Sequence, residues 1–184
     1  MSTDRTLAKA ASQVYAANLL EASKAKGNIL EITAEMEQIF STVIGNVDLR
    51  NTLSDHAIPV TTRQSIASEV FAGYDEVLLA VFSVIVQRND IMLLSRVAEA
   101  YLELAEQALG AIIIDVTTVV SLDDDLRRII KDKYAAQLGS DVILREHVDK
   151  GILGGIILST HGRRIDASVV SQLENARVTL SKRN

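Results

Sequence analysis

The chain has 184 residues, which is enough for one domain of ordinary size or two small ones. It contains no cysteine, so disulfides and thiolate metal sites are excluded. Its net charge of −5 and its 4% aromatic content argue against nucleic-acid binding, because that function needs clustered cations and rings for stacking. No signal peptide and no apolar run long enough to cross a membrane are expected.

A long first helix is predicted from about Thr6 to Ala25. One apolar face contains Leu7, Ala11, Val14, Tyr15 and Leu19, and further alanines widen it on both sides. A helix that is apolar over so much of its circumference must be covered on more than one side. Two interpretations remain open: a central core helix of a bundle, or a face that partly receives a helix from another chain.

Glycines and the single proline divide the rest of the N-terminal half into further helices. Gly27, Gly45 and Gly73 are predicted to end helices, and Pro59 interrupts the helical pattern. Thr61 or Thr62 is predicted to cap the helix after the proline. Asp75 is predicted to start the next helix, which is apolar nearly all round. The last helix of the series runs to Leu109. Short connections between about six helices predict a bundle.

After Gly110 the pattern changes from helix to strand. A period of two puts four residues on one face, namely Ile112, Ile114, Val116 and Val120. Ser121 is predicted to cap a following helix that has the acidic run 123–125 in its first turn. The core face of that helix is predicted to contain Leu126, Ile129, Ile130 and Leu138.

The end of the chain is predicted to form strands and one helix. A second strand runs to Val148, and a hairpin with a tight turn over 160–163 leads to a final helix capped by Asp166. Gly154 and Gly155 are interpreted as places where backbones pass closely. The order β-α-β-β-α gives an α+β chain: an N-terminal six-helix bundle over 1–110, then a small C-terminal α/β domain over 111–184.

The sequence contains no pattern typical of catalysis or of a cofactor site. His56, His147 and His161 are isolated from one another, and no nucleophile elbow is present. The glycines at 151, 154 and 155 lack the lysine of a phosphate-binding loop and precede a strand rather than a helix. The charge of a helix start explains the acidic run 123–125. We therefore expect no catalytic, metal or cofactor-binding residue.

Several stretches resemble the delta subunit of F-type ATP synthases, whose mitochondrial relative is the oligomycin-sensitivity-conferring protein. The C-terminal signature of that family is similar to residues 149–155, 165–169 and Leu173. Further similar stretches are 14–20 in the first helix, 93–102 in the sixth helix and 113–122 around the first strand. Two positions depart from the family pattern: the basic residue after the fifth helix is shifted to Arg88, and Lys150 replaces a proline.

The resemblance implies a non-catalytic stator subunit. Such a subunit links the catalytic alpha/beta head to the b-type subunits of the peripheral stalk, so that the head does not rotate with the rotor during proton-driven ATP synthesis. The resemblance also implies a place on the cytoplasmic face of a bacterial plasma membrane, peripheral to it. The implied site for the N-terminal helix of an alpha subunit is a groove between the first and fifth helices. The residues expected there are Ala11, Tyr15, Leu19, Val81, Val84 and Ile85.

Two other functions remain open from the sequence. One is a helical adaptor or regulatory protein that binds a small ligand between its domains. The other is an enzyme whose site follows no known motif. Turnover by the purified chain alone would support the enzyme, and a ligand-dependent melting shift without a membrane partner would support the adaptor.

Overall fold

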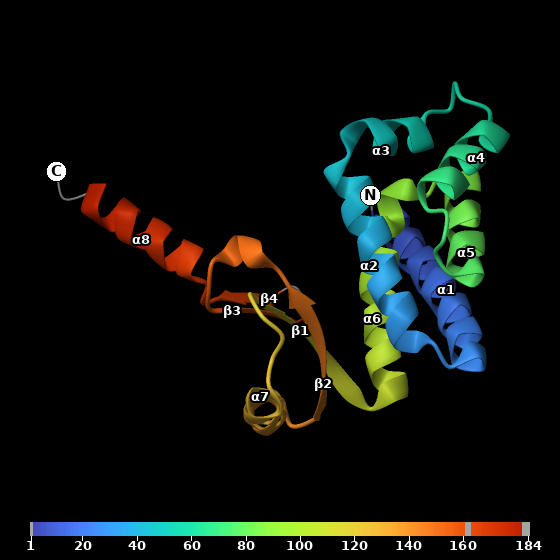
Figure 1. Cartoon of the computed structure of the whole chain (residues 1–184). Helices are drawn as coiled ribbons and strands as arrows, with labels where there is room; N and C mark the ends of the chain where they lie inside the picture. The colour runs from blue at the N-terminus through green and yellow to red at the C-terminus, as the bar shows by residue number, and fades with distance from the viewer. Residues whose placement is uncertain (1, 161–162, 182–184) are drawn as a thin grey trace. The chain divides into compact units, whose positions relative to one another are not determined.

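The computed structural model describes residues 2–160 and 163–181 and divides the chain into two compact units, Met1–Ala108 and Leu109–Asn184. The first unit is helical, and the second contains a mixed sheet with two helices (Figure 1). The predicted α+β class is therefore confirmed. Within the described residues, no helix combines the length and the apolarity that crossing a membrane requires.

Glycines and short turns separate the helices of the first unit. These are α1 (Ser2–Lys26), α2 (Ile29–Gly45), α3 (Val47–Ser54), α4 (Val60–Val70), α5 (Glu76–Gln87), a 3₁₀ turn (Ile91–Leu93) and α6 (Leu94–Leu109). Gly27 follows α1 with a φ of 73°, a conformation that other residues rarely adopt. α2 ends at Gly45, as predicted. Asn89, which also has a positive φ of 61°, separates α5 from the 3₁₀ turn.

Two helix starts in this unit differ in how they are capped. Asp75 directly precedes α5, which confirms the predicted helix start, and it caps the helix: its Oδ1 accepts a hydrogen bond from the Val77 N–H at 2.8 Å. The cap predicted at Thr61 or Thr62 is wrong, because α4 begins at Val60, directly after Pro59, and has no side-chain cap. The proline ring fixes a backbone angle that suits the entry to a helix, so α4 starts earlier than the threonines suggest.

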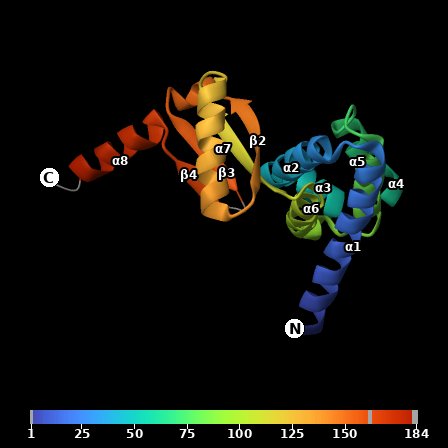
Figure 2. The same ribbon diagram turned by 90° about the horizontal axis from the view of Figure 1, so that it is seen from below.

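The core of the first unit combines one face from each of the longer helices. Tyr15 and Leu19 of α1 lie in it together with Phe82 and Ile85 of α5. Phe71 packs edge-to-face against Phe82, with ring centroids 5.3 Å apart. These contacts fix α1 against α5, and both views show the two helices side by side (Figures 1 and 2).

The second unit is built on a four-stranded sheet in the order β2-β1-β3-β4. The elements are β1 (Ala111–Thr118), α7 (Asp124–Leu138), β2 (Asp141–Val148), a 3₁₀ turn (Lys150–Ile152), β3 (Ile156–Thr160), β4 (Arg163–Asp166) and α8 (Val169–Ser181). β1 pairs with β2 in parallel and with β3 antiparallel. β3 and β4 pair antiparallel, which confirms the predicted hairpin before the last helix; the predicted order β-α-β-β-α had counted its two strands as one. Residues 161 and 162 of the predicted turn lie outside the described residues.

The face of α7 that packs on the sheet differs from the predicted one. Ile130 and Tyr134 pack against the apolar cluster that Ile112, Ile114 and Val116 form on the sheet. Of the predicted core face, Leu126, Ile129 and Leu138 are exposed. An ion pair from Arg127 Nε to Glu146 Oε1 of β2, 2.5 Å long, holds the helix in this rotation. The helix cap is Asp123, whose Oδ1 accepts from the Leu126 N–H at 2.7 Å, and not the predicted Ser121.

Two further expectations at the strand ends are corrected. Val120 is exposed rather than on the core face, because β1 ends at Thr118. The α8 cap is Ser168, whose Oγ accepts from the Ser171 N–H at 3.2 Å. Asp166, the predicted cap, instead accepts from the Ser168 N–H and hydroxyl and so orients the residue that does cap the helix.

Candidate functional site

The six residues predicted to bind a partner lie on α1 and α5, which contact each other. The side chains of Leu19 and Ile85 are 0% exposed, and Tyr15 is also buried. Ala11 and Val81 are half-buried at the edge of the core. Val84 is 38% exposed. The fold therefore places three of the predicted residues on α1 and three on the neighbouring α5. Of these six, only Ala11, Val81 and Val84 reach the surface.

Two large apolar residues of α1 are exposed beyond the predicted set. Leu7 and Val14 lie on the solvent side of α1, and with Ala11 they follow helical spacing along one stripe. Val81 and Val84 share a stripe of α5 in the same way. We call these five residues the α1–α5 apolar surface. The sequence placed Leu7 and Val14 on the same face as Tyr15 and gave no signal to separate the buried part of that face from the exposed part.

A polar contact anchors this region of α1. The Tyr15 hydroxyl donates to Asp90 Oδ2 at 2.7 Å, which ties α1 to the connection between α5 and α6. Burial first, and then the Asp90 carboxylate, raises the pKa of the Tyr15 hydroxyl above its ordinary value, while Arg88 opposes that shift. The hydroxyl therefore stays protonated and keeps donating to Asp90.

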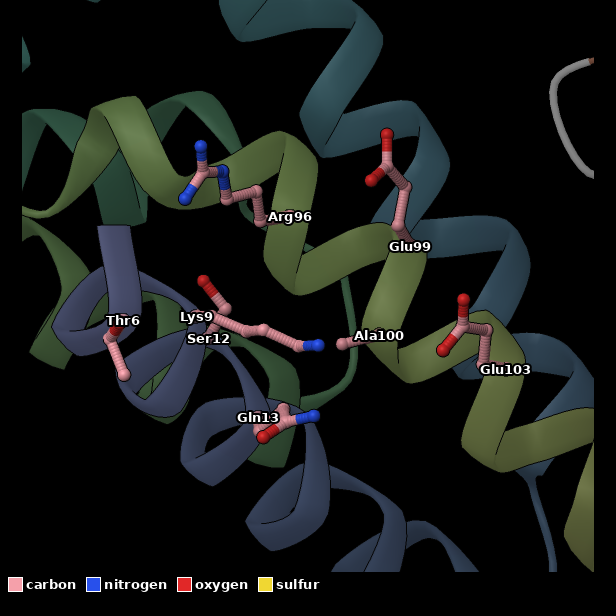
Figure 3. A pocket seen from close by; sticks show the side chains of 8 residues that line it. All are labelled: Thr6, Lys9, Ser12, Gln13, Arg96, Glu99, Ala100 and Glu103. Atoms are coloured by element: carbon pink, nitrogen blue, oxygen red, sulfur yellow. The ribbon is translucent and has the colours of Figure 1, made fainter. Parts of the chain in front are cut away.

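A pocket lies on another side of α1, where it faces α6. Its volume is about 490 Å³, and its lining residues are Thr6, Lys9, Ser12, Gln13, Arg96, Glu99, Ala100 and Glu103. Figure 3 shows the Lys9 side chain reaching from α1 toward Ala100 of α6. None of the six predicted residues lines this pocket. Its polar residues follow the helical spacing typical of a solvated face, so the sequence gave no reason to single them out.

The pocket combines two cations, Lys9 and Arg96, with two carboxylates, Glu99 and Glu103, and all four side chains are exposed. Exposed charges of both signs keep their ordinary hydration, and the buried Ser12 hydroxyl already donates to the Ala8 carbonyl, so neither is prepared for acid–base or nucleophilic catalysis. We therefore assign the pocket no chemical role.

The histidines of the described residues lie in separate places. His147 is exposed on β2, with its Nε2 3.2 Å from Asp115 Oδ1. The His56 Nε2 is 2.7 Å from the Asn89 amide nitrogen. His161 lies outside the described residues. No group of three or more metal-ligating side chains occurs in the part of the chain that the structure describes.

Comparison with known proteins gives one consistent result. Residues 11–180 match the family described as ATP synthase delta (OSCP) subunit. The "ATP synthase subunit delta" of Chlorobium luteolum is 30% identical, over 93% of this chain and 95% of that protein. The protein of the same name from Flavobacterium psychrophilum is 28% identical, over 91% of this chain and 94% of that protein.

A solved structure supports the fold. A chain in the structure of the Toxoplasma gondii mitochondrial ATP synthase hexamer is similar, with a TM-score of 0.54. The similarity covers 92% of this chain and 96% of that chain, at 14% sequence identity. At that identity the likeness concerns the fold alone.

Proposed function

The chain belongs to the ATP synthase delta (OSCP) subunit family, and from that premise we propose that its first unit binds the N-terminal helix of an alpha subunit while its second unit binds b-type subunits of the peripheral stalk. Membership makes it a non-catalytic stator component of an F-type ATP synthase. It replaces the alternatives of an adaptor and of an enzyme. We also propose that α1 to α6 act together as one bundle.

The observation that carries the alpha-subunit proposal is the α1–α5 apolar surface. Leu7, Val14 and Val84 expose large apolar side chains on two helices that pack against each other. An amphipathic helix can lay its apolar face on such a surface. Each Å² of apolar area removed from water contributes roughly 25 cal/mol. A stator joint must resist torque, so it needs slow dissociation, and burial of apolar area provides this without any chemistry.

The buried members of the predicted set support this surface from below. Tyr15, Leu19 and Ile85 lie in the core and hold α1 against α5. Direct contact with the alpha helix is therefore proposed for Ala11, Val81 and Val84 from the prediction, together with Leu7 and Val14. Substitution of Leu19 or Ile85 would act through the stability of the first unit.

The test uses Val84→Asp in the full chain. A carboxylate at this position would be buried without a partner when the alpha helix docks, so we expect the affinity for a peptide of the alpha N-terminus to fall more than about tenfold in calorimetry. Val84 is 38% exposed, so the fold should persist, as circular dichroism would show.

Val60→Asp is the matched control, because Val60 is 37% exposed and lies on α4. It should bind the peptide as the wild type does. Undiminished binding by Val84→Asp, or equal losses in both variants, would refute the assignment of the alpha site to the α1–α5 apolar surface.

The location follows from the complex. Delta subunits of this family are peripheral to the membrane. We propose that this chain lies on the cytoplasmic face of a bacterial plasma membrane, held there by its partners. Cell membranes are isolated, and the catalytic head is then removed from one half of the preparation. We expect the chain on the untreated membranes, and after head removal either with the released head or still on the stalk. Recovery of the free chain in both cases would contradict this placement.

A further inference from the structure

The C-terminal end of α5 closes in a way that usually selects glycine. Asn89 follows the helix with a φ of 61°, and its N–H donates to the Val86 carbonyl at 3.1 Å. The Asp90 N–H donates to the Ile85 carbonyl at 2.9 Å. This pair of hydrogen bonds is the Schellman motif, in which glycine is the commonest residue at the position with positive φ. The backbone here does not need the Asn89 side chain, so the contacts of that side chain require another explanation.

The Asn89 side chain connects a buried cation with an exposed histidine. Its Oδ1 accepts from Arg63 Nη1 at 3.0 Å, and its Nδ2 lies 2.7 Å from His56 Nε2. The same Nη1 also donates to the Leu53 and Val86 carbonyls, which holds the guanidinium in place. A guanidinium has only donors. The Asn89 amide must therefore keep its oxygen toward Arg63 and its NH₂ group toward His56, because the reverse orientation would set two donors against each other.

This orientation fixes the protonation state of His56. The Asn89 NH₂ group is a donor, so Nε2 of His56 must be an acceptor. Only the neutral ring with its proton on Nδ1 offers an acceptor there. The imidazolium form donates from both nitrogens. Protonation of His56 therefore removes the contact, and the amide cannot turn around to restore it.

Charged groups of both signs lie in the segments that meet at this contact, namely Asp55, Arg63, Arg88 and Asp90. Both carboxylates already accept hydrogen bonds. One accepts from the Ala57 N–H at 2.8 Å and the other from the Tyr15 hydroxyl at 2.7 Å. Because charges of both signs act on His56, the number of donors, and not the net charge, decides whether the contact forms.

The junction that carries Asn89 also holds α1. Asp90 follows Asn89 directly, and its Oδ2 accepts from the Tyr15 hydroxyl. Tyr15 is next to Val14 on α1, and Val84 lies in the last turn of α5. A displacement of Asn89 therefore moves the anchor that fixes the spacing of α1 and α5, the two helices of the α1–α5 apolar surface.

We propose that Asn89 is a positioning residue for the α1–α5 apolar surface and that it makes binding of the alpha helix depend on the proton of His56. With neutral His56 the amide is held from both sides, and the Asp90 anchor keeps α1 in place. With protonated His56 the amide loses one partner, and the surface binds the helix more weakly. This inference rests on the proposed alpha-binding function and adds a regulation of the same site by pH.

The first test measures the affinity of the full chain for the alpha N-terminal peptide by calorimetry at about pH 8 and about pH 5, a range in which imidazole groups change charge. We expect the wild-type affinity to fall about three- to fivefold in acid, the size of one exposed hydrogen bond. His56→Gln should not show this fall, because its side-chain oxygen accepts from Asn89 at both pH values.

His147→Gln is the matched control for the loss of a histidine. His147 is 54% exposed and lies on β2 of the second unit, so this variant should keep the wild-type fall in acid. An equal fall in the wild type and in His56→Gln, or the absence of the fall in His147→Gln, would overturn the inference.

Asn89→Gly removes the side chain and keeps the backbone. Glycine adopts the positive φ at this position without strain, so the closure of α5 should persist and circular dichroism should show a folded chain. Its affinity at the higher pH should be as low as that of the wild type in acid, and it should not change with pH. Wild-type affinity at the higher pH, or a wild-type fall in acid, would show that the Asn89 side chain does not position the surface.

The ring nitrogens of His56 test the mechanism directly. In nuclear magnetic resonance of the isotope-labelled full chain at the higher pH, Nε2 should have the shift of an unprotonated nitrogen and Nδ1 that of a protonated one. The opposite tautomer would contradict the orientation of the Asn89 amide and overturn the inference.

The two levels of the argument fail differently. If the wild-type chain does not bind the alpha peptide at either pH, the proposed function of the first unit is wrong. If it binds with the same affinity at both pH values, the function stands and the inference about Asn89 and His56 is wrong.

Discussion

Gly155 lies where the loop before β3 passes closest to the residues that precede α8. Its φ is +82°, and a Cβ built there would be 2.3 Å from the Ala167 carbonyl oxygen. The close approach expected of these glycines is thus confirmed at Gly155, and Gly154 similarly touches Val169. No side chain can be added at 155 without moving backbone.

Gly155→Ala should therefore destabilise the second unit by more than backbone strain alone. Gly139→Ala is the control, because Gly139 has a φ of +69° but nothing within 4 Å of its added Cβ. The control should lose about 1–2 kcal/mol. Gly155→Ala should lose about 1–3 kcal/mol more through the clash. The free energy of unfolding of both variants can be measured by denaturant unfolding, with hydrogen exchange in β3 as the probe. Equal losses in the two variants would show that the close approach does not exist.

Among the helices of the first unit, Asp75 connects the end of α1, the start of α2 and the first turn of α5. Its carboxylate accepts from Lys26 at the end of α1, from Asn28 before α2 and from the first turn of α5. Burial by itself would raise the pKa of this carboxyl, but the hydrogen bonds from Lys26, the Val77 N–H and Asn28 outweigh it, so the pKa lies below its ordinary value. The charged form is thus favoured in the folded state.

A lowered pKa fixes the direction of the pH dependence. The stabilisation by the Asp75 carboxylate is fully present above the unfolded-state pKa and is lost as the pH falls through the lower folded-state value. A double-mutant cycle of Asp75→Asn and Lys26→Met should give a coupling of about 0.5 kcal/mol at pH 7, since Lys26 is well solvated. The coupling should begin to decline as the pH falls below about 4 and should vanish only below the lower folded-state pKa of Asp75. A coupling that persists unchanged there would contradict the ionic contact.

Element boundaries could be predicted from the sequence where one residue decides them. Gly27 and Gly45 end helices, and Asp75 begins one, as local backbone chemistry requires. The rotation of α7 could not be predicted, because Leu126 and Ile129 follow the same helical spacing as core residues. Only the sheet and the Arg127–Glu146 pair decide which side of α7 is covered.

The contacts of a buried cation could not be predicted from the sequence either. Arg63 is 3% exposed and donates to the Leu53 and Val86 carbonyls and to Asn89 Oδ1. The two carbonyls lie at the ends of α3 and α5, where helix dipoles favour a positive charge. These acceptors come from distant parts of the chain, so no local pattern announces the contact. The sequence similarly predicted the apolar helix faces of the candidate site. It could not predict which residues of those faces would be exposed.

At the scale of the whole molecule, two compact units are joined in one chain that belongs to a stator family. We propose that each unit holds a different partner at the same time, the first an alpha subunit and the second b-type subunits of the stalk. The two proposed partners would occupy different units, so neither should compete for the residues that the other needs.

The most direct test of this account is native mass spectrometry of the full chain mixed with the alpha N-terminal peptide and a C-terminal fragment of the b-type subunit, the b fragment. We expect a ternary complex, from which Val84→Asp removes only the peptide and leaves the b fragment bound. Mutually exclusive binding of the two partners, or a ternary complex that Val84→Asp leaves intact, would contradict the proposed function.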